Sequence, residues 1–65
     1  MTKAKKITYW LTQKSVNSKM WIEYIRDSKD TSLDMDVIKY IKKCERIYYL
    51  RTMHAHKKLK KLGAI

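Results

Sequence analysis

The chain has 65 residues and carries 16 lysines and arginines against 6 acids, for a formal net charge of +10. This length allows one small domain, near the lower limit at which a core is stable without a metal, disulfides or a partner chain. Two tryptophans and five tyrosines exclude a disordered basic tail, and the positive charge excludes an acidic mimic of nucleic acid.

We therefore expect a single domain over residues 1–65, with a basic arm at 1–6 and a tail at 63–65, that forms a homo-oligomer or a complex with a larger protein. The only cysteine, Cys44, excludes an intramolecular disulfide and suits a reducing, cytoplasmic setting, which includes the cytoplasm of a host cell. No apolar stretch reaches about 18 residues, so we expect neither a membrane span nor a signal peptide.

The first segment, residues 6–13, fits two patterns. Ile7, Trp10 and Leu11 have helical spacing, whereas Ile7, Tyr9 and Leu11 alternate with their neighbours as in a strand. We prefer a helix and keep a strand as the alternative.

Turn signals come from polar clusters, because the chain has one glycine and no proline. The clusters at 15–18 and 27–32 divide it into three segments. Between them, residues 18–27 place Met20, Trp21 and Tyr24 on one side, which predicts a second short helix.

The third segment, residues 33–62, predicts one long helix with two distinct faces. At about 100° per residue, its apolar side chains form one narrow stripe and its lysines lie on the opposite side. We thus expect an all-α fold in which two short N-terminal helices, the first of them helix or strand, pack on a long basic amphipathic C-terminal helix. The stripe consists of Val37, Ile41, Cys44, Tyr48, Ala55, Leu59 and Leu62, and the basic side of Lys39, Lys42, Lys43, Arg46, Lys57, Lys60 and Lys61.

Residues 11–25 resemble a helix-turn-helix, because Ser15, Val16 and Asn17 have the family's order of small, apolar and capping residues at the turn. The chain departs from the family at Leu11, Lys14 and Ser15, where the family has a small residue, an apolar residue and glycine. The resemblance implies a DNA-binding recognition helix whose groove-facing residues are Ser18, Lys19, Ile22, Glu23 and Arg26.

A weaker resemblance, to ribbon-helix-helix repressors, concerns residues 7–12 and the helix entry at 15–18. It implies a strand whose base-facing side chains are Lys6, Thr8, Trp10 and Thr12.

Catalytic and metal signals are weak. His54 and His56 are two residues apart, so on a helix they point about 200° away from each other and do not share a metal. The chain has no glycine-rich phosphate loop and no recognisable nucleophile with a neighbouring base. We expect no enzyme activity, no metal and no cofactor. Four aromatic residues suit either base stacking or the core: Trp10, Trp21, Tyr48 and Tyr49.

The basic side of the long helix predicts a nucleic-acid-binding protein whose lysines contact the phosphates of DNA or RNA. A regulator is one candidate role for such a protein. The alternative is an inhibitor of the kind that phages encode, docking on an acidic protein surface of a host nucleic-acid-processing or defence protein. A membrane-surface helix fits least well, because the apolar stripe holds few large lipid-seeking side chains.

Overall fold

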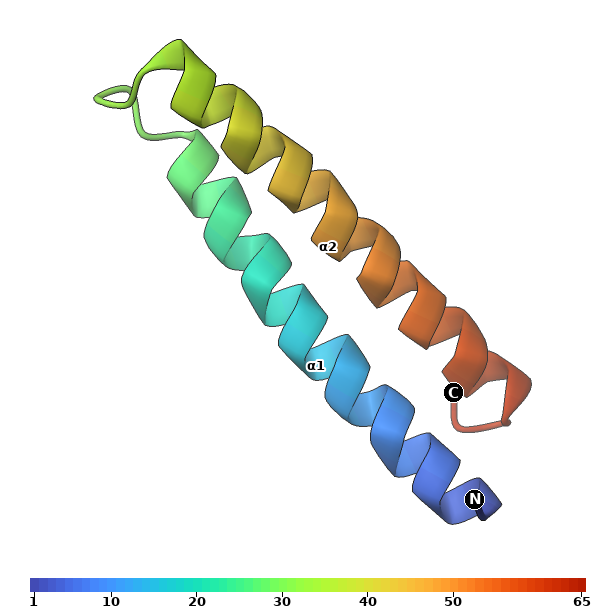
Figure 1. The fold of residues 1–65 in the computed structure, drawn as a ribbon. Helices are drawn as coiled ribbons and strands as arrows, with labels where there is room; N and C mark the ends of the chain where they lie inside the picture. The colour runs from blue at the N-terminus through green and yellow to red at the C-terminus, as the bar shows by residue number, and fades with distance from the viewer.

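The computed structural model describes all 65 residues as two antiparallel helices, α1 (Lys3–Ser28) and α2 (Met35–Lys61), joined by residues 29–34. The helices lie side by side along almost their whole length, so the loop lies at one end and both termini at the other (Figure 1). The hairpin measures 47 × 18 × 13 Å along its principal axes. It is an elongated molecule with one interface between its two elements.

The N-terminal half is one continuous helix, so the expectation of two short elements there is wrong, and so is the strand considered for residues 6–13. Within the polar cluster at 15–18, the Asn17 Nδ2 donates to the carbonyl of Gln13 at 2.8 Å, and the Ser18 hydroxyl donates to the carbonyl of Ser15 at 3.1 Å. These side chains bond to the carbonyls of their own helix instead of forming a turn. Residues 3–28 contain neither glycine nor proline, so no residue that commonly breaks a helix lies within α1.

The predicted long C-terminal helix is present as α2, and its end is well defined. Gly63, at φ 76°, is the only residue with a positive φ. Its N–H donates to the carbonyl of Lys60 at 3.1 Å, and the N–H of Ala64 donates to the carbonyl of Leu59 at 3.0 Å. This pair of bonds is the Schellman ending, which favours glycine at this position.

The loop is held by Asp30. Its Oδ1 accepts hydrogen bonds from the Ser32 hydroxyl at 2.6 Å and the Ser32 N–H at 2.9 Å. These bonds stabilise the charged form and lower the pKa of the Asp30 carboxyl below its ordinary value.

The core is small, because only six residues are buried. Four are apolar residues of the predicted stripe on α2: Ile41, Cys44, Ala55 and Leu59. From α1 only Asn17 is buried, whereas Val37, predicted in the stripe, is 43% exposed. Two helices alone bury little apolar surface per residue.

Aromatic side chains fill much of the remaining interface. Tyr24 stacks on Tyr48 with ring centroids 5.5 Å apart, and Trp21 meets Tyr49 at 5.2 Å. Toward the termini, Trp10 meets the imidazole of His54 edge to face at 5.3 Å. Such contacts hold the helices together over most of their length, and they involve all four aromatic residues weighed above for base stacking.

Candidate functional site

The seven cationic residues predicted to contact phosphates are all exposed. Most of them lie on the side of α2 that faces away from α1, while Lys42, Arg46 and Lys61 also line hollows at its edges, beside α1. We call this set the lysine face. It consists of Lys39, Lys42, Lys43, Arg46, Lys57, Lys60 and Lys61.

The lysine face is a straight ridge. From Lys39 to Lys61 it extends about 33 Å at 1.5 Å per residue, and α2 shows no kink along this length (Figure 1). Its cations form two clusters, at 39–46 and 57–61, with the exposed Leu50 between them. The only acid within this range, Glu45, is half-buried and lines the groove beside α1. The outward potential of the ridge is therefore positive throughout.

The antiparallel arrangement also separates charge along the hairpin. The half that holds the termini, residues 1–14 and 51–65, has nine lysines and arginines and no acidic side chain. The loop half, residues 15–50, has seven cations and all six acids. The fold thus brings the basic N-terminal residues, which begin α1, beside the lysines that end α2.

This terminal end contains a hollow that sequence reasoning missed. It has a volume of about 420 Å³ and is lined by Lys6, Lys58 and Lys61 together with Tyr9 and Trp10. Lys58 lies at the edge of the helix interface, so the wheel of α2 alone did not place it with the lysine face. The sequence did contain a signal for this hollow, since lysines are concentrated near both ends of the chain. That signal predicts a shared site only when the two ends are known to lie side by side.

The residues assigned to a recognition helix lie on the other helix. Lys19, Ile22 and Arg26 are exposed and Ser18 is half-buried, all within the second half of α1. Lys19 and Arg26 are on the back of α1 and the lysine face is on the back of α2, so the two predicted sets lie at opposite edges of the hairpin.

Near the loop end, tyrosines surround the buried thiol of Cys44. Burial and the neighbouring Cys44 raise the pKa of Tyr24, and a hydrogen bond with Cys44 raises the pKa of Tyr40. Both hydroxyls stay protonated at neutral pH, as ordinary tyrosines do.

The two histidines contact different α1 side chains, His54 with Trp10 and His56 with Lys14. Nowhere in the hairpin do three or more His, Cys, Asp or Glu side chains gather as a metal site would require. Neither helix combines the length and the apolar character needed to cross a membrane. Compared with protein-family models, with curated proteins and with solved structures, the chain gives no match.

Proposed function

We propose that this protein binds nucleic acid through the lysine face of α2. The observation that carries the proposal is the ridge itself, seven exposed cations along about 33 Å of a straight helix in which the only acid between Lys39 and Lys61 is the half-buried Glu45. This length is close to one turn of B-form DNA, about 34 Å. A ridge of this length has room for contacts with several successive phosphates.

Lysine suits contact with the phosphate backbone more than the reading of bases. Its ammonium is a flexible point charge without the fixed fork of arginine, and six of the seven residues in the lysine face are lysines. Phosphate contacts position a protein without conveying sequence information. We therefore expect binding that depends strongly on salt and weakly on sequence.

The test is fluorescence anisotropy of the purified protein with labelled duplex DNA, single-stranded DNA and RNA over a series of salt concentrations. Each neutralised phosphate releases counterions, so the logarithm of the affinity should fall linearly with the logarithm of the salt concentration. Binding that is absent or insensitive to salt would contradict the proposal. A strong sequence preference would instead assign base contacts to α1, through Ser18, Lys19, Ile22 and Arg26.

A further inference from the structure

The hairpin exposes more surface than a compact protein of its mass. Its accessible surface is 5252 Å², whereas a folded monomer of 7.9 kDa is expected to expose about 4,400 Å². The radius of gyration is 14.6 Å, compared with about 11 Å for a compact domain of this length. The excess of roughly 850 Å² is close to the area that one partner contributes to a standard interface, about 800 Å².

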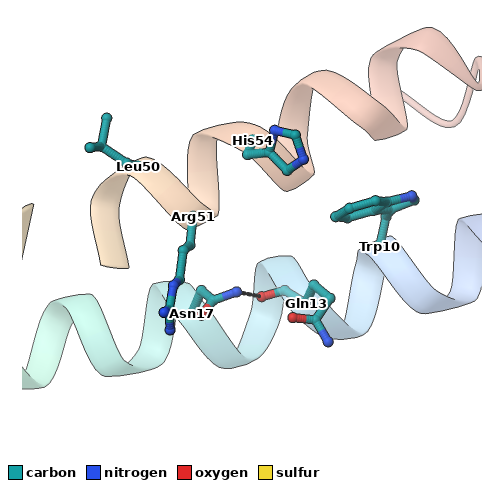
Figure 2. Close-up of a pocket in the computed structure, with 6 residues that line it drawn as sticks. All are labelled: Trp10, Gln13, Asn17, Leu50, Arg51 and His54. Carbon is teal, nitrogen blue, oxygen red and sulfur yellow. Dashed lines mark hydrogen bonds between the residues drawn. The ribbon is translucent and has the colours of Figure 1, made fainter. Parts of the chain in front are cut away.

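One side of the hairpin carries five large apolar side chains, of which four are exposed and one, Met20, is half-buried. We call it the association face and define it by Tyr9, Val16 and Met20 on α1 and Tyr40 and Ile47 on α2. A rotation of about 100° per residue puts all five on the side of the groove in Figure 2. Tyr40 is 66% exposed and Val16 is 54% exposed, and it is their occurrence on one side together, not the exposure of each, that indicates an interaction surface.

The groove lies on the terminal side of the hairpin's midpoint. It has a volume of about 410 Å³, and its floor is the buried Asn17, beside Gln13 and Arg51 (Figure 2). Met20 and Ile47 lie on the other side of the midpoint, toward the loop. A two-fold axis through the midpoint, perpendicular to the helices, would place Met20 and Ile47 of each copy over the groove of the other.

Charge on the same face selects this antiparallel orientation. Toward the loop the face carries the exposed acids Glu23 and Asp27, and toward the termini it carries the cations Lys5, Arg51 and Lys58. If the two copies lay parallel, their acid-free terminal halves would repel each other. When they lie antiparallel, Asp27 of one copy faces Lys5 of the other.

The opposite side of the hairpin lacks this complementarity. It also exposes apolar side chains, Leu11 at 49% and Ile22 at 53%. Its only acid, however, is the half-buried Glu45, whereas Lys14, Lys42 and Lys60 are distributed along the same side.

We propose that two copies of this chain associate through the association face, in antiparallel orientation, to form a four-helix bundle. The interface is isologous, because each copy contributes the same residues. Helices of such bundles pack 8–10 Å apart and slightly off antiparallel, which suits two hairpins this straight. The dimer follows from area, apolar exposure and charge, and does not rest on nucleic-acid binding.

The antiparallel dimer also has a consequence that does rest on the proposed function. The two-fold axis keeps both copies of α2 on the same edge of the bundle, so the two lysine faces point in one direction. One nucleic acid would then meet both ridges. A parallel dimer would place them on opposite edges.

The oligomeric state is tested by analytical ultracentrifugation of the full chain without nucleic acid. We expect twice the chain mass of 7.9 kDa. The variant carrying Val16→Glu and Ile47→Glu should sediment as a monomer, because charges buried in the interface destabilise it. The matched variant carrying Leu11→Glu and Ile22→Glu, on the opposite side, should remain a dimer.

Wild-type protein that is monomeric from micromolar to millimolar concentration would overturn the proposal and leave this face free for a different protein. If only the variant at Leu11 and Ile22 loses the dimer, the two copies associate through the opposite side of the hairpin, and the proposed association face is wrong. If the Val16 and Ile47 variant does not fold, the melting temperature of the wild type, measured at several protein concentrations, distinguishes a dimer from a monomer. It rises with protein concentration for a dimer whose folding is coupled to association and is constant for a monomer.

Orientation is tested with single cysteines in a Cys44→Ser background, joined by a flexible bismaleimide. A mixture of Lys5→Cys and Asp27→Cys chains should give a cross-linked heterodimer. Each variant alone should cross-link poorly, because its two cysteines lie at opposite ends of the bundle. Efficient cross-linking of either variant with itself would show a parallel dimer.

Discussion

Lys14 of α1 and His56 of α2 form a side-chain hydrogen bond across the helix interface, with the Lys14 Nζ 3.2 Å from the His56 Nδ1. Both side chains are half-buried. Because an ammonium only donates, the imidazole Nδ1 accepts this bond. A positive group of α1 is thereby held against the end of α2 that carries most of the lysines.

A double-mutant cycle on this pair should show favourable coupling. We expect Lys14→Met and His56→Leu each to lower the free energy of unfolding, and the pair to have a coupling energy of about 1 kcal/mol. Urea unfolding followed by circular dichroism measures both. Additive effects would mean that the hydrogen bond contributes nothing to stability.

The buried Asn17 should be replaceable by leucine. Its side-chain bond goes to Gln13 of the same helix, so it does not join α1 to α2. We expect Asn17→Leu to raise the free energy of unfolding by about 1 kcal/mol, through apolar burial and better helix propensity. Ser15→Leu, on the exposed side of α1, is the control and should change it little. A less stable Asn17→Leu protein would indicate that the amide has a partner outside this hairpin.

The fully buried Leu59 is the best test of the small core, because its side chain is 0% exposed. We expect Leu59→Ala to lower the free energy of unfolding by about 2–4 kcal/mol, since it removes apolar contacts and leaves a cavity. Thermal unfolding measures the effect. A loss below about 1 kcal/mol would mean that α1 and α2 do not pack as described.

The Asp30 carboxyl predicts a pH dependence of stability. Its pKa is lower in the folded protein than in the unfolded chain, so its contribution is present above the unfolded pKa of about 3.9 and is lost as the pH falls through the folded value. We expect Asp30→Ala to lower the melting temperature at pH 7 and to have little effect at pH 2. Asp34→Ala is the matched control, because the Asp34 side chain makes no capping hydrogen bond.

The same pKa is accessible to NMR titration. Ser32→Ala removes the stronger donor, so the Asp30 pKa should rise toward its ordinary value. An unchanged pKa in that variant would show that the Ser32 hydroxyl does not bind the carboxylate in solution.

The long C-terminal helix was predictable because its apolar stripe and lysine face keep one period through residues 33–62. The continuous α1 was missed because the polar run 15–18 was interpreted as a turn. A signal against that turn was present: Trp10, Asn17, Trp21 and Tyr24 are spaced seven, four and three, which keeps one helix face across the cluster.

The concentration of charge at the terminal end needed the tertiary arrangement. Lys6 and Lys58 are far apart in sequence, and only the antiparallel packing of α1 on α2 brings them to one hollow. A helical wheel describes each helix alone and does not determine which ends meet. The lysine face could be predicted from the sequence without the tertiary arrangement, because all of its residues belong to α2.

The most direct test of nucleic-acid binding compares two variants of equal charge. One changes four lysines of the lysine face, Lys39, Lys42, Lys57 and Lys60, to glutamine, and the other changes four lysines elsewhere, Lys3, Lys6, Lys19 and Lys29. Both keep the same net charge, so a difference in affinity reports position and not total charge. With the helical content of both confirmed by circular dichroism, we expect the first to lose most of its affinity for duplex DNA and much of its salt dependence, while the second binds nearly as well as the wild type. Equal losses in the two variants would contradict a binding site on the lysine face.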